Sequence, residues 1–151
     1  MQVVRVALAE RSYPIHIGSN LLGDARLYAP HVKAGRVAVV SNEVVAPLYL
    51  DQVRQALAQA GAQTVPVLVD DGEQAKSWQM LDRVIDALLA ARLGRDSLIV
   101  ALGGGVVGVP EADCVVVVGG VDGVGLGERL VRLGEGAGVL ILEEYGMARR
   151  R

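Results

Sequence analysis

Short apolar runs alternate with amphipathic stretches along this chain, and that alternation restricts the fold more than any other feature of the sequence. The runs that we expect to form strands lie at 2–8, 13–17, 36–40, 64–69 and 97–102. Between them, residues 44–60 and the residues after Ser77 carry apolar side chains at helical spacing. Alternating strands and helices are typical of a parallel sheet with right-handed crossovers. The sequence therefore predicts an α/β fold, with a Rossmann-like, doubly wound and mainly parallel sheet.

Single residues indicate where these elements end. Gly61 is placed to close the helix over 44–60, and Ser77 is placed to cap the next helix. Pro66 cannot donate a ladder hydrogen bond, so we expect the strand at 64–69 to lie at an edge of the sheet. The second helix has an apolar stripe that we expect to face the core or another subunit. The stripe comprises Trp78, Leu81, Val84, Ile85, Leu88 and Leu89.

The composition excludes several classes of protein. Apolar residues make up 52% of the chain and charged residues 21%, which rules out a disordered chain. The net charge of −2 lacks the basic excess of proteins that bind nucleic acid or membrane surfaces, so we expect neither partner. No apolar run is long enough to cross a membrane. The single cysteine, Cys114, excludes an internal disulfide framework and favours a cytoplasmic location.

The residues that most often bind metals are scarce. His16 and His31 lie far apart in the sequence and have no carboxylate or cysteine neighbours at ligand spacing. Cys114 precedes a run of valines and is expected to be a buried apolar residue. We therefore expect no metal ligand and no catalytic base among these three residues.

Three polar or glycine-rich segments follow predicted strands directly. They are 41–43, 70–76 and 103–108. In a doubly wound sheet, ligands bind beyond the carboxyl ends of the strands, which is where all three segments are expected. This shared location is the strongest indication of function that the residues provide by themselves.

Each segment has a functional interpretation and a simpler one. The glycines of 103–108 could cradle a pyrophosphate with backbone N–H groups, or could only make a tight turn. Glu73 and Gln74 could accept hydrogen bonds from a ribose or an adenine, and Lys76 could bind a phosphate. The same loop could instead be a solvated segment that starts a helix. Asn42 could contact a nucleotide or cap the helix that follows it.

Two motifs together resemble one known family. Asp-Gly-Glu-Gln-x-Lys at 71–76 is followed by Ala-Leu-Gly-Gly-Gly-Val-Val-Gly at 101–108, and SNEVVAPLYLDQVR precedes both at 41–54. In this order and spacing they resemble the N-terminal domain of 3-dehydroquinate synthase. The opening segment, 10–22, is also similar to the family. The resemblance covers about residues 1–108.

The resemblance implies a lyase of the shikimate pathway, which leads to chorismate and the aromatic amino acids. Enzymes of the family use NAD catalytically to convert 3-deoxy-arabino-heptulosonate 7-phosphate into 3-dehydroquinate and phosphate, with zinc or cobalt as a Lewis acid. On this chain, the resemblance implies a set of cofactor-binding residues in the three segments. The set is Asn42, Asp71, Gly72, Glu73, Gln74, Lys76, Gly103, Gly104, Gly105, Val106, Val107 and Gly108.

The chain departs from the family in three places. Ala75 replaces the usual aromatic residue, and Val109-Pro110 interrupts the helix that normally follows the glycines. Beyond 108, no residue matches the helical C-terminal domain, which carries the metal ligands and the substrate-binding residues. We therefore assign no catalytic residue and no metal ligand. We expect the chain to be inactive alone and to meet the sugar-phosphate substrate only if that domain is supplied. A homodimer also fits the family.

Residues 109–151 form a tail rich in glycine and valine, which we separate from the NAD-binding domain at 1–108. It is expected to form strands at 114–118 and 139–142, with a short helix at 128–133. That order is similar to the opening of short-chain dehydrogenases, with Glu143 at the place of a ribose-binding acid. The tail could equally have no function. The alternatives to the synthase are thus a non-catalytic dinucleotide-binding or structural remnant, or a dehydrogenase-like unit at 114–144.

Overall fold

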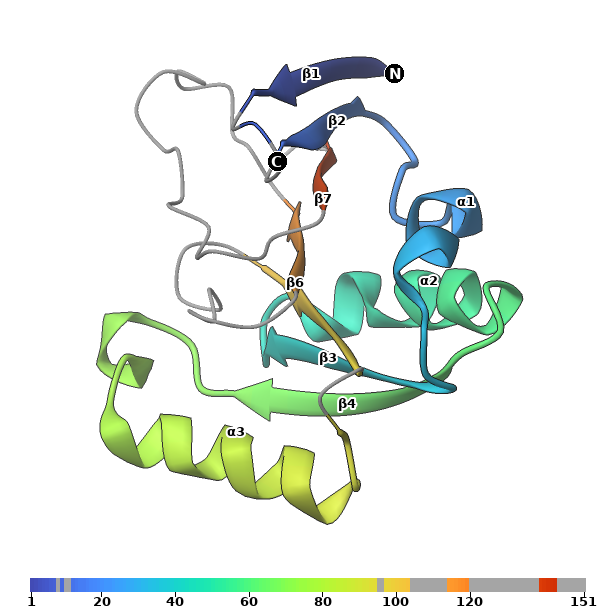
Figure 1. Cartoon of the computed structure of the whole chain (residues 1–151). Helices are drawn as coiled ribbons and strands as arrows, with labels where there is room; N and C mark the ends of the chain where they lie inside the picture. The colour runs from blue at the N-terminus through green and yellow to red at the C-terminus, as the bar shows by residue number, and fades with distance from the viewer. Residues whose placement is uncertain (8, 10–11, 95–96, 104–113, 120–138, 144–151) are drawn as a thin grey trace.

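The computed structural model describes residues 1–7, 9, 12–94, 97–103, 114–119 and 139–143. A seven-stranded sheet runs through the molecule in the order β1-β2-β7-β6-β5-β3-β4 (Figure 1). Its strands are β1 (Gln2–Val6), β2 (Tyr13–Gly18), β3 (Arg36–Asn42), β4 (Gln63–Val69), β5 (Leu98–Leu102), β6 (Cys114–Gly119) and β7 (Val139–Glu143). The helical segments are α1 (Ala25–Tyr28), η2 (Ala29–His31), α2 (Ala46–Gln59), η3 (Glu73–Ala75) and α3 (Trp78–Ala90).

The sheet is parallel except at one end. β1 and β2 pair in antiparallel fashion, and every other neighbouring pair is parallel. α2 follows β3 and α3 follows β4, so each helix crosses between strands that run in the same direction. The prediction of an α/β fold with a mainly parallel sheet is confirmed. Among the described residues, no helical domain follows the sheet.

Helices cover both faces of the sheet around β3. Val37 and Val39 of β3 pack with Leu57 of α2 and with α1. Val40 of the same strand packs with Val84 of α3. Figure 1 shows α1 and α2 on one side of β3 and β4, and α3 on the other. This double covering explains why β3 is a continuous apolar run rather than an alternating one.

The predicted element ends agree with the structure. Gly61 follows α2 at a φ of +87°, and the Ser77 side chain accepts a hydrogen bond from the Met80 amide at the start of α3. β4, which contains Pro66, is an edge strand. Each of these residues therefore has the local role that its chemistry predicts.

Of the two alternatives predicted for the α3 stripe, packing against the core of this chain is wrong for four of its residues, and contact with another subunit stays a prediction. Trp78 is 80% exposed and Leu89 is 66% exposed, and Leu81 and Ile85 are exposed as well. The core-facing side of α3 is instead formed by Met80 and Val84, which pack on β3 and β4. Because β4 is the last strand of the sheet, only one side of the helix finds strands to cover it.

No helix in the described part of the chain is long and apolar enough to span a membrane. The helix expected at 128–133 lies outside the described residues. β6 and β7, which the sequence placed in the tail, lie inside the sheet between β5 and β2.

Candidate functional site

The three candidate segments follow the carboxyl ends of three neighbouring strands, which form the carboxyl edge of the sheet. β5, β3 and β4 are adjacent and parallel, so their carboxyl ends lie side by side. Asn42 ends β3, Asp71 lies two residues after β4, and Gly103 follows β5. The expectation that these segments share one edge is met by the described residues.

Asn42 joins two of these segments. Its side chain is buried, and its Nδ2 donates a hydrogen bond to Asp71 Oδ1 at 2.9 Å. Its Oδ1 accepts a hydrogen bond from the Val45 amide at 2.8 Å. Asn42 thus holds the loop after β4 against the end of β3, and also organises the turn that enters α2. The prediction that Asn42 caps α2 is wrong, because the N-cap residue is Val45, which has no side-chain cap hydrogen bond; Asn42 instead fixes the turn before the helix and contacts the loop.

Gly72 allows the loop after β4 to close on itself. Its φ is +93°, and a Cβ atom there would lie 2.7 Å from Gln74 Oε1. Gln74 Nε2 donates a hydrogen bond to the Asp71 carbonyl at 3.2 Å, and the Ala75 amide donates to the Gly72 carbonyl at 3.0 Å. A side chain at position 72 would therefore be strained and would displace Gln74.

The far end of the same loop is fixed to α3. The Met80 amide donates to Ser77 Oγ at 3.2 Å, and the Arg83 guanidinium lies 3.6 Å from the Asp70 carboxylate. Lys76 is exposed and lies next to the Ser77 cap. The loop thus has a defined shape, with a cation where it meets the helix.

Ser41 is a residue of this edge that the sequence analysis did not assign. It is fully buried, and its Oγ donates a hydrogen bond to the Leu102 carbonyl at 2.8 Å. Leu102 is the last residue of β5 and precedes Gly103, whose φ is +152°. The sequence does contain an indication of this role, because a serine at the end of a buried apolar strand needs a hydrogen-bond partner for its hydroxyl.

The predicted site residues fall into three groups. Asn42, Asp71, Gly72 and Gln74 form one hydrogen-bonded or packed cluster, with Lys76 at its α3 end. Gly103 lies at the neighbouring strand end, and Glu73 lies in η3. The remaining predicted residues lie outside the described part of the chain. They are Gly104, Gly105, Val106, Val107 and Gly108.

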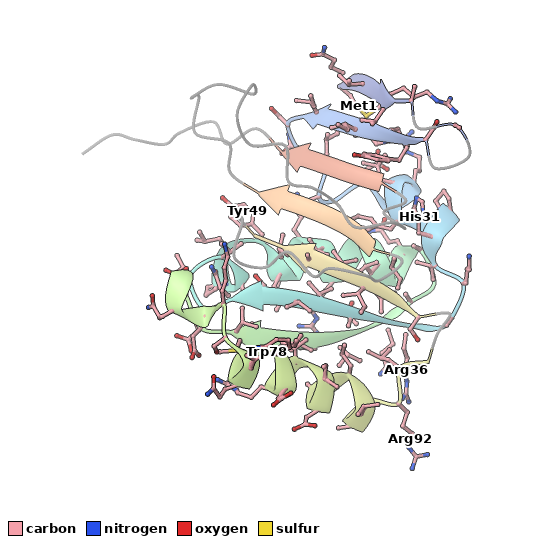
Figure 2. All side chains as sticks on the ribbon, turned by 60° about the vertical axis from the view of Figure 1, so that its left-hand side comes forward. Met1, His31, Arg36, Tyr49, Trp78 and Arg92 are labelled. Atoms are coloured by element: carbon pink, nitrogen blue, oxygen red, sulfur yellow. The ribbon has the colours of Figure 1, made fainter. Side chains whose placement is uncertain are left out.

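The described residues do not fit a divalent metal ion. Within them, no group of three or more His, Cys, Asp or Glu side chains could hold one. His31 lies in η2 (Figure 2), where burial lowers its pKa and the nearby Lys33 lowers it further. We therefore derive no metal-dependent step from these residues.

Comparison with known proteins shows which proteins are similar to this part of the chain. The 3-dehydroquinate synthase N-terminal family model matches residues 66–122, which include the loop and the glycine run. The chain is 54% identical over 108 residues to 3-dehydroquinate synthase from Pseudomonas aeruginosa (strain LESB58), covering 72% of this chain and 29% of that protein. It is 50% identical, with the same coverage, to the enzyme from Pseudomonas syringae pv. tomato (strain ATCC BAA-871 / DC3000).

Over its N-terminal 72%, the chain is thus similar to the N-terminal part of 3-dehydroquinate synthases. The chain spans 29% of the length of these curated relatives. The resemblance seen in the motifs at 71–76 and 101–108 is thereby confirmed.

Solved structures of other proteins share the fold of this chain. One is 2-deoxy-scyllo-inosose synthase complexed with carbaglucose-6-phosphate, NAD⁺ and Co²⁺, with a TM-score of 0.72, 15% identity, and coverage of 94% of this chain and 46% of that one. Another is ValA, a 2-epi-5-epi-valiolone synthase from Streptomyces hygroscopicus subsp. jinggangensis 5008 with NAD⁺ and Zn²⁺ bound. It has a TM-score of 0.60, 23% identity, and coverage of 91% and 44%. At these identities the likeness concerns the fold alone.

Proposed function

We propose that this chain carries the NAD-binding half of a 3-dehydroquinate synthase. The observation that carries the proposal is the closed loop at 71–76, which Asn42 holds at the carboxyl edge of the sheet. The same motif lies in the part of the chain matched by the family model. Two related folds were solved with NAD⁺ bound, which supports this cofactor.

Each part of the edge would have its own role toward NAD. The backbone N–H groups of the glycine run that begins at Gly103 would face the pyrophosphate, which needs close approach without a Cβ atom. Lys76 would supply a positive charge near the phosphates. Glu73 and Gln74 would accept hydrogen bonds from the ribose or the adenine. Asn42 would hold the loop that carries them in place.

The complete reaction requires more than this edge. In the full enzyme, NAD bound at this site would supply reversible hydride transfer for the conversion of 3-deoxy-arabino-heptulosonate 7-phosphate into 3-dehydroquinate and phosphate. The described residues supply no cluster for a metal ion. The chain by itself would therefore bind NAD without turning over the sugar phosphate, and activity would return if a helical partner domain supplied the metal and substrate residues.

One observation supports a second candidate. Gly119 and Glu143 are register partners at the carboxyl ends of the adjacent parallel strands β6 and β7. In short-chain dehydrogenases a glycine turn and a ribose-binding acid follow two such strands. A dinucleotide could therefore bind at 114–144 instead. Against this, Tyr145 is not followed by a lysine four residues later, as a Tyr-x-x-x-Lys pair would require. A remnant that binds nothing is the third alternative.

The proposal is tested by titrating NAD into the purified chain in a calorimeter, with two lysine variants. Lys76 lies at the carboxyl edge, whereas Lys33 precedes β3 and lies toward the opposite edge. We expect Lys76→Ala to weaken binding about 10-fold, because a charge-assisted contact is lost, and Lys33→Ala to leave it unchanged. Equal affinities for all three proteins would reject the proposed site, and absence of binding to a folded chain would reject NAD as its ligand.

A further inference from the structure

We propose that Ser41 is a positioning residue that fixes the Leu102–Gly103 peptide, at which the proposed phosphate-binding glycine run begins. The inference rests on the proposed function, because it concerns the same nucleotide site. It adds a residue that neither the motifs nor the family resemblance selected. Three observations carry it: the burial of Ser41, its hydrogen-bond partner, and the place of that partner before a glycine.

Ser41 is a polar residue that directly follows the apolar run of β3. The preceding residues Val37, Val39 and Val40 are all buried, as is Ser41 itself. A buried hydroxyl without a partner costs stability, so serine is not favoured here by packing alone. Its Oγ donates to the Leu102 carbonyl at 2.8 Å, across the pairing between β3 and β5. The Ser41 hydroxyl therefore donates its hydrogen to the carbonyl oxygen of Leu102, at the end of β5.

That atom determines the direction of an amide. The Leu102 carbonyl and the Gly103 N–H belong to one planar trans peptide unit, in which they point in opposite directions. A hydrogen bond that fixes the carbonyl therefore also fixes the N–H. Gly103 has a φ of +152° and no Cβ atom, so its own side chain cannot restrict the peptide. Ser41 supplies the restriction from outside.

Ser41 and Asn42 act as a pair. Consecutive residues of a strand point to opposite faces, so the two side chains leave β3 in different directions. Asn42 reaches Asp71 in the loop after β4, and Ser41 reaches the end of β5. β3 lies between those two strands. The end of β3 is thus hydrogen-bonded both to the loop after β4 and to the end of β5, the two parts of the proposed site.

The experiment compares two hydroxyl deletions. Ser41→Ala removes the bond to Leu102, and Tyr28→Phe removes a buried bond of the same kind, from Tyr28 Oη to the Leu22 carbonyl at 3.0 Å, in the core between α1 and α2. NAD affinity is measured by calorimetry well below the melting temperature of each protein. We expect Ser41→Ala to weaken NAD binding about 3- to 10-fold, which corresponds to one hydrogen bond, and Tyr28→Phe to change it less than about 2-fold.

A second readout reports the amide directly. In the ligand-free protein, the Gly103 amide resonance should shift in Ser41→Ala and stay in place in Tyr28→Phe. If Ser41→Ala does not fold, Ser41→Cys gives the same comparison, because it fills the site with a weaker donor.

The outcomes separate the two proposals. Absence of NAD binding to the folded wild type overturns the proposed function, and this inference with it. Normal binding to wild type and to Ser41→Ala overturns the role of Ser41 alone. Equal weakening in Ser41→Ala and Tyr28→Phe would also overturn it, because the effect would then come from general loss of stability.

Discussion

The two long helices, α2 and α3, end with the same pattern of backbone hydrogen bonds, although the first residue of that pattern is Gly61 in one and Arg92 in the other. After α2, the Gly61 amide donates to the Ala58 carbonyl and the Ala62 amide donates to the Leu57 carbonyl. After α3, the Arg92 amide donates to the Leu89 carbonyl and the Leu93 amide donates to the Leu88 carbonyl. Gly61 has a φ of +87° and Arg92 a φ of +55°. Arg92 extends from the end of α3 (Figure 2). A left-handed conformation is free of strain for glycine and costly for arginine.

This contrast predicts opposite effects on stability. Arg92→Gly should raise the free energy of unfolding by about 0.5–1 kcal/mol, and Gly61→Ala should lower it by about 1 kcal/mol. Nothing lies within 4 Å of a Cβ built at Gly61, so its cost would be purely conformational. Urea denaturation measures both values. Loss of stability in Arg92→Gly would show that the Arg92 side chain makes a stabilising contact.

His31 should make stability depend on pH. Burial, aided by Lys33, lowers the pKa of its imidazole below the ordinary value of about 6.5. The unfolded chain then binds a proton more readily than the folded chain. Stability is therefore complete above that ordinary value and is lost as the pH falls through the lower, folded pKa. We expect the free energy of unfolding to fall between pH 7 and 5, and His31→Gln to reduce that slope. An unchanged slope in the variant would assign the pH dependence to other groups.

The sequence predicted that the segments after β3, β4 and β5 meet at the carboxyl ends of the strands, but it did not predict the hydrogen bonds that join them. Asn42 and Gln74 were predicted as cofactor-binding residues, and the structure shows that both donate hydrogen bonds to Asp71 in the loop after β4. Spacing along a chain cannot show this, because the partner of Asn42 lies in a different loop. Ser41 was missed for the same reason: its partner, Leu102, is on another strand.

At the scale of elements, periodicity located α3 correctly but did not identify its buried side. Trp78, Leu81, Ile85 and Leu89 form an arc beside the true core side, and the helix is apolar across both. Burial depends on which strands lie beneath the helix. The edge position of β4 leaves the arc uncovered, and helical spacing alone contains no information about that position.

A pair of truncations tests this assignment. Met80→Ala should cost about 2–5 kcal/mol, because Met80 packs with Val67 and Val84 in the core. Leu89→Ala, on the same helix but 66% exposed, should change stability by less than about 0.5 kcal/mol. Thermal denaturation at two protein concentrations measures both effects. A large, concentration-dependent cost for Leu89→Ala would show that a second copy of the chain covers the arc.

β3 shows why the strands themselves were predictable. Its apolar run is bounded by Gly35 and a polar segment, and helices on both faces demand apolar residues at every position. Local chemistry also located the edge strand, since Pro66 in β4 lacks an amide hydrogen. Predictions of this kind succeed when a single residue or run determines the outcome.

At the scale of the whole molecule, strand order was not predictable. β2 pairs with β7, so strands from the two ends of the described chain lie side by side. β6 and β7 complete the sheet between β5 and the β1–β2 hairpin. Alternating runs indicate a parallel sheet but leave the order of its strands open, because order is decided by long-range packing. The division of the chain at residue 108 stays a prediction.

If the loop at 71–76 forms a nucleotide site, as we propose, substitutions of two glycines should affect NAD binding differently. Gly72 and Gly61 both have positive φ, at +93° and +87°, but only Gly72 lies in the loop, with Gln74 against it. NAD binding is measured by calorimetry for wild type, Gly72→Ala and Gly61→Ala. We predict saturable binding to wild type, an affinity within about 2-fold of it for Gly61→Ala, and a loss of about 10-fold or more for Gly72→Ala. Equal weakening by the two substitutions, or no binding to folded wild type, would contradict the claim.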